Sequence, residues 1–200
     1  MKGGNVYNKY DQSFGLQKLI VANWKNRILQ LTNQSDAKTV HEIGCGEGEI
    51  SRLIEANSRT IIASDVCPEV IELAKSLGKQ KNSKVQFKQK DIYKLENESD
   101  SADLIICCEV LEHLEHPDTA INSIKRLDFK NVIFSVPAEP LWRILNLARG
   151  AYWKDMGNTP GHIQHWTPNA FVSLLSKHFT IEKVYHPIPW TVIYCSRRFK

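Results

Sequence analysis

Short apolar runs alternate with longer amphipathic segments along most of this chain, and this alternation limits the folds that it can adopt. The apolar runs predict strands at 39–43, 60–64, 84–88, 104–108, 131–136, 181–185 and 191–194. Segments with helical period occupy 14–31, 48–56, 68–77, 111–127, 140–149 and 168–177. Strands and helices that take turns in this way predict a parallel sheet with helices on both faces, joined by right-handed crossovers.

The end of the chain departs from this alternation. Only residues 186–190 separate the last two predicted strands, and a connection of this length cannot hold a crossover helix. The final strand should therefore return antiparallel, as part of a hairpin. The expected fold is α/β: a doubly wound, seven-stranded, mostly parallel sheet with an antiparallel last strand.

The composition is that of one globular domain. The 200 residues are 42% hydrophobic and 24% charged, which is enough to bury one sizeable core. The longest apolar run, 104–108, is far shorter than a membrane-spanning helix, and residues 1–5 resemble no signal-peptide core, so we expect a cytoplasmic protein. Five cysteines without paired spacing indicate reduced thiols, and a net charge of +4 is too small to indicate nucleic acid by itself.

A glycine-rich loop follows the first predicted strand and leads into a helix. Gly44 and Gly46 let the backbone turn tightly and approach a ligand closely. A dinucleotide fingerprint would need glycine at position 49, where the chain has Glu49, and no Gly-Lys-Ser/Thr follows to make a phosphate-binding loop. Glu42 and Glu47 would repel a pyrophosphate. The loop therefore favours a ligand that carries positive charge.

Two aspartates follow the next two predicted strands. Asp65 ends the second strand, where a carboxylate can accept hydrogen bonds from both hydroxyls of a ribose. Asp91 follows the third strand and can accept from an adenine amino group, with Ile92 beside it to cover the ring. Either aspartate alone could be a helix cap or a turn residue. Together with the loop, they indicate one cationic ligand that contains adenosine.

These motifs resemble, in their order, those of class I S-adenosylmethionine-dependent methyltransferases: Glu42-x-Gly44-x-Gly46-x-Gly48, Asp65, Asp91-Ile92 and Cys107-Cys108-Glu109-Val110-Leu111-Glu112-His113-Leu114. The resemblance implies a Rossmann-like methyltransferase fold and S-adenosylmethionine as the cofactor. Residues 135–140 and 161–168 are similar to those of small-molecule methyltransferases of the ubiquinone/menaquinone-like group. The resemblance implies these cofactor-binding residues: Glu42, Gly44, Cys45, Gly46, Asp65, Val66, Asp91, Ile92, Cys108 and Glu109.

The chain then divides into three parts of a single methyltransferase domain, 1–200. Residues 1–35 are expected to form an N-terminal lid and helix, 38–137 the cofactor-binding core, and 138–167 a cap on the acceptor side. The cap is long for a connection and is rich in tryptophan and histidine, which suits a lid over an acceptor. His162, His165 or His113 could act as the general base, although a structural, hydrogen-bonded histidine is an equal alternative.

A divalent metal is a further, less favoured possibility. Glu109, Glu112 and His113 have the spacing i, i+3, i+4, so a helix would present all three on one face, and His162 could complete a four-ligand site. A related arrangement occurs in small-RNA 2′-O-methyltransferases, and a similar Glu-x-x-Glu-His occurs in ubiquinone-pathway O-methyltransferases. The same local sequence also occurs in family members thought to need no metal.

The sequence thus favours methyl transfer to an oxygen of a small aromatic, apolar or lipid-linked acceptor. An RNA 2′-O-methyltransferase that uses the glutamate and histidine site is an alternative, although the chain has no recognisable RNA-binding appendage. A non-catalytic S-adenosylmethionine-binding protein is another. Residues 141–149 combine apolar residues, an indole and two arginines, and could rest on a membrane. The acceptor's identity and the oligomeric state stay open.

Overall fold

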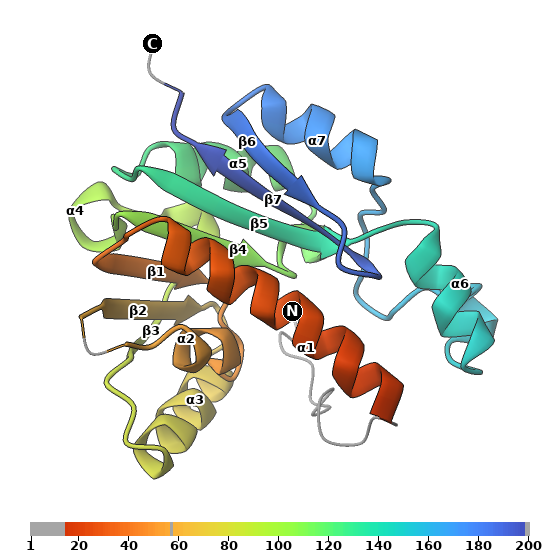
Figure 1. Cartoon of the computed structure of the whole chain (residues 1–200), viewed down its shortest axis with the longest axis horizontal. Coiled ribbons are helices and arrows are strands. Elements are labelled where there is room, and N and C mark those ends of the chain that lie inside the picture. The colour runs from red at the N-terminus through yellow and green to blue at the C-terminus, as the bar shows by residue number, and fades with distance from the viewer. Residues whose placement is uncertain (1–14, 57, 199–200) are drawn as a thin grey trace.

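The computed structural model describes residues 15–56 and 58–198, and within them the sheet has seven strands (Figure 1). The strands are β1 (Thr39–Ile43), β2 (Thr60–Asp65), β3 (Gln86–Gln89), β4 (Leu104–Cys108), β5 (Asn131–Pro137), β6 (Thr180–Tyr185) and β7 (Trp190–Ser196). Their order in the sheet is β3-β2-β1-β4-β5-β7-β6. All neighbours pair in parallel except β7, which runs antiparallel to both β5 and β6. The predicted sheet and its antiparallel last strand are confirmed.

The helices and 3-10 turns connect these strands. The α-helices are α1 (Gly15–Gln34), α2 (Glu49–Leu53), α3 (Pro68–Gln80), α4 (Asn97–Asp100), α5 (Pro117–Lys125), α6 (Leu141–Ala148) and α7 (Pro168–Ser176). The 3-10 turns are η1 (Ile92–Lys94), η2 (Leu111–His113) and η3 (Trp153–Asp155). Within the described residues, no helix combines the length and the hydropathy needed to cross a membrane.

Side chains alternate along the central strands, so both faces of the sheet are apolar. On one face Leu104, Ile106 and Ile133 pack under α1 and α2. On the other face Ile105 and Phe134 pack under α5 and α7. The sheet is therefore covered on both faces as the alternation predicts, and the carboxyl ends of its parallel strands are left at one edge.

Two predicted helices have different bounds in the structure. The predicted helix at 111–127 is interrupted, because the residue before a proline is disfavoured in helical conformation and Pro117 instead opens α5 at its first turn. The helix predicted at 68–77 is longer in the structure, because α3 continues through Gly78 to Gln80. There Gly78 is buried, and a Cβ would lie 3.1 Å from the ring of Phe87, so a close approach between α3 and β3 requires the glycine.

The predicted N-terminal lid lies mostly outside the described residues, which begin at Gly15. Of the segment 1–35, the structure describes α1, whose Trp24, Ile28 and Leu31 enter the apolar core. The lid function of the residues before it stays a prediction.

Candidate functional site

The loop between β1 and α2 lies at the carboxyl edge of the sheet. Gly44 and Gly46 both have positive φ, at 76° and 53°. A Cβ on Gly44 would lie 2.2 Å from Cγ2 of Val110, whereas a Cβ on Gly46 would meet none of the described residues within 4 Å. The backbone N–H groups of Gly44 and Cys45 both donate to the carbonyl oxygen of Ser64. The loop is therefore held against β2, and among the described residues it is open at Gly46, where a ligand can approach its backbone.

Asp65, the last residue of β2, faces this loop. Its Oδ2 accepts from the backbone N–H of Gly46 at 3.0 Å, and its Oδ1 accepts from the N–H of Cys67 at 3.0 Å. An ionised carboxylate offers about four acceptor positions, so capacity for ligand hydroxyls remains. The neighbouring Val66 is 56% exposed. An oriented carboxylate and an exposed apolar side chain therefore lie side by side.

Asp91 begins the turn after β3. Both interpretations of this residue, as a cap and as an acceptor for an adenine amino group, are compatible with the structure. Its Oδ1 accepts from the N–H of Tyr93 and so caps η1, while its Oδ2 lies 4.0 Å from Nζ of Lys94. Ile92 is buried in the core beside it. The cap orients the aspartate, and its predicted contact with an adenine stays a prediction.

Glu42 takes a different position from that expected of a residue contacting a cationic ligand. Its side chain is buried beneath the glycine loop and accepts a hydrogen bond from the hydroxyl of Ser51 in α2. Burial raises the pKa of the Glu42 carboxyl to about 8, although the Ser51 hydrogen bonds and the charge of Arg52 oppose the shift. At neutral pH the carboxyl is therefore mostly protonated and supports the loop from below, and its predicted part in cofactor binding stays a prediction.

Two of the predicted binding residues are cysteines with inert thiols. Cys45 and Cys108 are both buried, and burial raises the pKa of each thiol above its usual range. A neutral buried thiol is a poor nucleophile. Any contribution of these two residues to ligand binding must come from their backbone.

Glu109 follows β4 and is held by a hydrogen-bond network. Its backbone is in the left-handed region, with φ at 58°. Its Oε1 accepts from Oγ of Ser135 at 3.1 Å, and its Oε2 accepts from Nε1 of Trp190 at 2.8 Å. Nε1 of Trp24 donates in turn to Oγ of Ser135 at 2.9 Å. Side chains from α1, β5 and β7 therefore fix this carboxylate at the centre of the carboxyl edge.

The four proposed metal ligands do not share the helical arrangement expected from their spacing. The predicted helix that would align Glu109 with Glu112 does not form, because Glu109 has a left-handed backbone and only the 3-10 turn η2 follows. Within the described residues, one potential ligand atom from each of Glu112, His113 and His162 lies within 4.8 Å of the others, and Glu109 is outside this cluster. The arrangement brings together three of the four proposed ligands.

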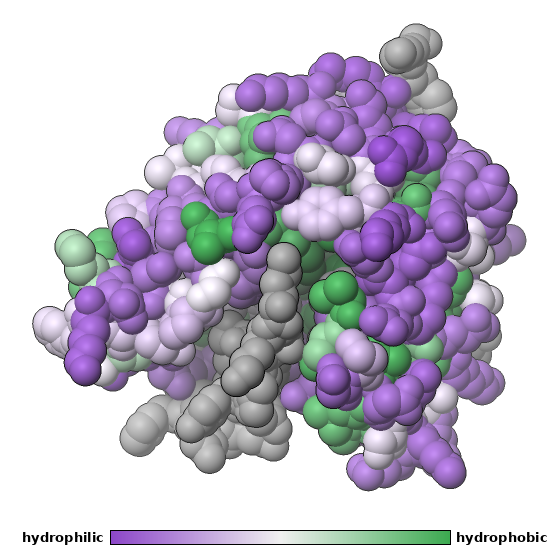
Figure 2. All heavy atoms as spheres, turned by 180° about the vertical axis from the view of Figure 1, so that it is seen from behind, coloured by the Kyte–Doolittle hydropathy of each residue, from purple (hydrophilic) through white to green (hydrophobic). Residues whose placement is uncertain are grey.

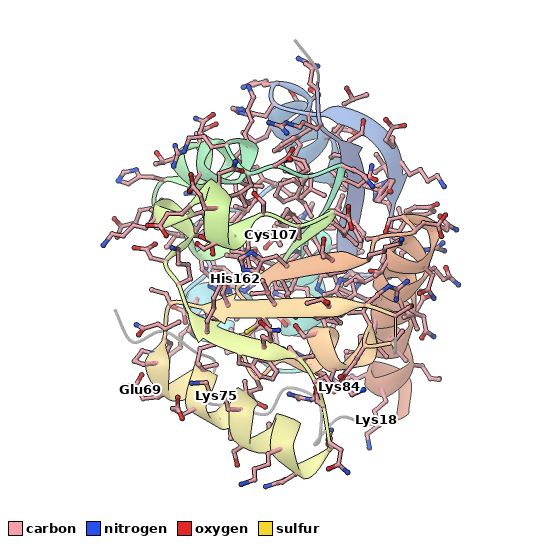
Figure 3. All side chains as sticks on the ribbon, turned by 90° about the vertical axis from the view of Figure 1, so that its left-hand side faces the viewer. Lys18, Glu69, Lys75, Lys84, Cys107 and His162 are labelled. Atoms are coloured by element: carbon pink, nitrogen blue, oxygen red, sulfur yellow. The ribbon has the colours of Figure 1, made fainter. Side chains whose placement is uncertain are left out.

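The histidine cluster joins the turn after β4 to the segment before α7. The backbone N–H groups of Ile163 and Gln164 both donate to the carbonyl of Glu112, and Nδ1 of His113 donates to the carbonyl of Gly161 at 2.9 Å. The rings of His113 and His162 meet edge to face at 4.8 Å. His162, which Figure 3 labels, is buried. These contacts lay the predicted cap against the carboxyl edge.

His165 is separated from this cluster. It is exposed, and its Nε2 lies 2.8 Å from Oδ1 of Asn158. His162, by contrast, stacks on Trp142 with ring centroids 5.9 Å apart. The three candidate bases therefore differ in position, and the geometry favours His162 and His113 over His165 as candidates for the general base.

Residues 41–133, the stretch that contains the glycine loop, both aspartates and the Glu112–His113 turn, match a family model described as a methyltransferase domain. We refer to this stretch, just under half of the chain, as the methyltransferase domain, after the family model that it matches. The magnesium protoporphyrin IX methyltransferase of Synechocystis PCC 6803 with bound SAH has the same fold, with a TM-score of 0.70 and 18% identity over 94% of this chain and 89% of that one.

Two curated relatives are similar to the methyltransferase domain over part of its length. A ubiquinone biosynthesis O-methyltransferase of Coxiella burnetii is 28% identical over 90 residues, which is 45% of this chain and 38% of that protein. A malonyl-[acyl-carrier protein] O-methyltransferase of Paenibacillus is 31% identical over 124 residues, which is 58% of this chain and 45% of that protein. The chain thus matches less than half the length of each relative.

The residues of the methyltransferase domain fit S-adenosylmethionine. The open space at Gly46 admits a ligand against the loop backbone, Asp65 has acceptor capacity for ribose hydroxyls, and the exposed Val66 offers an apolar surface. The fit rests on these donor, acceptor and apolar groups. The individual contacts predicted for the ten binding residues stay predictions.

Sequence reasoning missed the residues that hold Glu109. Trp24, Ser135 and Trp190 come from three elements far apart along the chain, and each reads locally as an ordinary core residue. Trp24 and Trp190 are also stacked, with ring centroids 5.2 Å apart. Only the strand order, which sets β7 beside β5, brings them together.

Proposed function

We propose that this chain catalyses S-adenosylmethionine-dependent methyl transfer to an oxygen of a small acceptor with aromatic or apolar character. The observation that carries the proposal is that the open glycine loop with Asp65, and the histidine-lined turn after β4, meet at one edge of the sheet. The first group suits the methyl donor, and the second can serve a hydroxyl acceptor.

On the donor side, the protein's task is binding and orientation. S-adenosylmethionine supplies an electrophilic methyl group when it is bound. The loop backbone at Gly46 and the carboxylate of Asp65 hold the donor, and the hydrogen bond between these two residues sets their geometry in advance. The exposed Val66 offers apolar surface for the adenine ring.

On the acceptor side, histidines provide a general base, and tryptophans provide an apolar surface that excludes water. Because Nδ1 of His113 donates to the carbonyl of Gly161, its Nε2 is the ring atom that can accept a proton from a hydroxyl. His162 lies against this ring. Trp142 and Trp190, with centroids 5.6 Å apart, add aromatic surface that excludes water and suits an aromatic or apolar acceptor.

The names of the two curated relatives support oxygen as the methylated atom, because both are O-methyltransferases. Since each match spans less than half of the relative, the acceptor itself is not carried over from either. We propose only the class: a small molecule with a hydroxyl or carboxyl oxygen and an apolar or aromatic body.

The test is to incubate the chain with methyl-labelled S-adenosylmethionine and an extract separated into lipid, small-molecule, RNA and protein fractions. We expect label in the lipid or small-molecule fraction, in a product that is stable or labile to base according to whether it is an ether or an ester. Label confined to protein would contradict the proposal. Donor binding without any labelled fraction would support the alternative of a non-catalytic binding protein.

A second candidate is RNA 2′-O-methylation with a divalent metal, which the cluster of Glu112, His113 and His162 favours. One carboxylate and two imidazoles are suitable ligands for several divalent ions, and a bound ion could hold a ribose hydroxyl. This candidate predicts label in RNA, loss of activity on chelation and recovery with magnesium or manganese. Unchanged rates after chelation would exclude it.

A further inference from the structure

Helix α6 exposes several of its apolar side chains. Trp142 and Asn146 are its buried residues. Leu141, Ile144 and Leu145 are exposed, with Ile144 at 55%. These residues and the exposed Ala148 recur at i, i+3, i+4 and i+7, which is the spacing of one helix face. A surface helix normally buries this face, so we call Leu141, Ile144, Leu145 and Ala148 the outward stripe and ask what covers it.

Hydrogen bonds prevent the stripe from rotating inward. Nδ2 of Asn146 donates to the carbonyl of Gly157 at 2.8 Å and to Oγ1 of Thr159 at 3.2 Å. Nε1 of Trp142 donates to the same hydroxyl of Thr159 at 2.9 Å. These polar contacts fix the inner face of α6, and Figure 1 shows the helix beyond the carboxyl end of β5, at the periphery of the molecule.

The segment after α6 adds the residue types that bind to a membrane interface. Trp153 in η3 is 67% exposed, and Arg149 and Lys154 are exposed nearby in the sequence. Residues 141–156 contain three basic side chains and one acidic side chain, Asp155. Indoles and basic groups beside an apolar helix face are complementary to anionic lipid. In the view from behind, hydrophilic residues predominate, although hydrophobic side chains also gather below the centre of that face (Figure 2).

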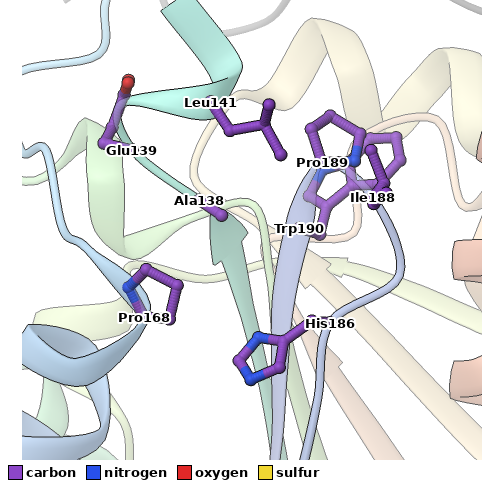
Figure 4. A pocket seen from close by; sticks show the side chains of 8 residues that line it. All are labelled: Ala138, Glu139, Leu141, Pro168, His186, Ile188, Pro189 and Trp190. Carbon is purple, nitrogen blue, oxygen red and sulfur yellow. The ribbon is translucent and has the colours of Figure 1, made fainter.

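The outward stripe leads to an apolar pocket. Leu141 and Ile188, both exposed, line an opening of about 160 Å³ together with Pro189 and Trp190 (Figure 4). Trp190 also donates to Glu109, so one indole contacts both the pocket and the centre of the candidate site. The volume is below that of ordinary small-molecule sites, and it suits part of a hydrocarbon chain.

We propose that the outward stripe of α6, with Ile188, docks on an anionic lipid bilayer, from which an acceptor with a hydrocarbon chain enters through the pocket beside Trp190. The acceptor half of this proposal rests on the proposed function. The docking half does not, because it concerns only the outer surface of α6 and the loop before β7.

The test is flotation of the full chain with vesicles, in the absence of methyl donor. One vesicle is phosphatidylcholine alone, and the other contains about 30% phosphatidylglycerol. We expect the wild type to float with the anionic vesicles and Ile144→Gln to lose about tenfold in partitioning, as burial of one aliphatic side chain implies. Leu73→Gln, at 44% exposure on α3, is the matched control and should float like the wild type. Lys154→Glu should lower the preference for anionic vesicles at least about fivefold.

Several outcomes would overturn the docking. A wild type that stays at the bottom with anionic vesicles, or an Ile144→Gln variant that floats unchanged, contradicts it. So does sedimentation showing a wild-type dimer that Ile144→Gln converts to a monomer, because the stripe would then face a second copy. Melting temperatures of all variants check that they fold. Asp65→Ala should float normally, so failure of methyl transfer and failure of docking are measured separately.

Discussion

At the scale of single residues, Asp65 links the structure of the loop to its proposed task. Its carboxylate accepts from the backbone of Gly46 and of Cys67, so the residue both holds the glycine loop and presents oxygens toward the open space. The position could be predicted from the sequence, because an acid that ends the second strand of a doubly wound sheet reaches the switch point. The hydrogen bond to Gly46 could not, because it depends on the left-handed turn of the loop.

Asp65→Ala should weaken the binding of S-adenosylmethionine by about 1.5–3 kcal/mol, because charge-assisted hydrogen bonds are lost. Calorimetric titration measures the affinity. Asp103→Ala is the control: Asp103 accepts from the backbone of Lys38 and Thr39 at the opposite edge of the sheet, so its loss should reduce stability and leave donor affinity unchanged. An Asp65→Ala variant that binds the donor as tightly as the wild type would remove the ribose assignment.

His162 and His165 are equivalent candidates in the sequence, and burial separates them in the structure. His162→Ala should lower turnover at least about tenfold, in line with the loss of a general base or its positioning, while donor affinity stays nearly intact. His165→Ala, an exposed residue bonded to Asn158, should keep most of the activity. Steady-state rates together with donor titration distinguish the two. Equal loss of donor binding in His162→Ala would assign this residue a structural role instead.

At the scale of elements, local sequence patterns predicted the strands well. The bounds of β1 and β4 agree with the predictions, and both strands are buried along nearly their whole length. The helices were harder, because periodicity does not show where a helix is interrupted by a proline or which of its faces is covered. Residues 140–149 had the period of a helix, but only the contacts of Asn146 and Trp142 show that these two residues face inward.

Asn146→Ala tests how α6 is held. The substitution removes two hydrogen bonds and leaves the buried carbonyl of Gly157 without the donor from Asn146. It should lower the free energy of unfolding by about 1–3 kcal/mol. Hydrogen exchange should lose protection in α6 and at residues 157–162, and should stay unchanged in β1 and β4. Asn169→Ala, an exposed residue of α7, is the matched control. Loss of protection throughout the sheet would contradict a local anchor.

At the scale of the whole molecule, two buried ionisable groups in neighbouring positions of β1 make opposite contributions to the pH dependence of stability. Nδ1 of His41 donates to the carbonyl of Asp100 and its Nε2 accepts from Ser64, and burial lowers the pKa of His41 to about 4. Burial raises the pKa of Glu42 to about 8. Adjacent positions on β1 thus keep a neutral base and a neutral acid in the interior. The sequence shows both residues in a strand, but their protonation depends on burial that only the folded chain defines.

The unfolded chain protonates His41 below pH 6.5, and the folded chain does so only near pH 4, so this residue makes stability rise with pH between those values. The unfolded chain loses the proton of Glu42 above pH 4.5, whereas the folded chain keeps it up to about pH 8. This residue therefore makes stability fall as pH rises over that window. The two slopes oppose each other between pH 4.5 and 6.5. Of these two residues, only Glu42 still contributes a slope above pH 6.5.

Wild-type stability should therefore change little between pH 4.5 and 6.5 and should fall by about 2 kcal/mol toward pH 8, at 1.36 kcal/mol for each pH unit. Glu42→Gln cannot release a proton, so its stability should rise up to pH 6.5 and then stay level. Urea unfolding at three pH values measures both profiles. Glu72→Gln, an exposed residue of α3, should keep the wild-type profile. An equal loss of stability above pH 6.5 in Glu42→Gln and in the wild type would contradict this prediction. The carboxyl beneath the glycine loop would then be ionised in the folded protein, and a role as a counter-charge to the donor would be favoured again.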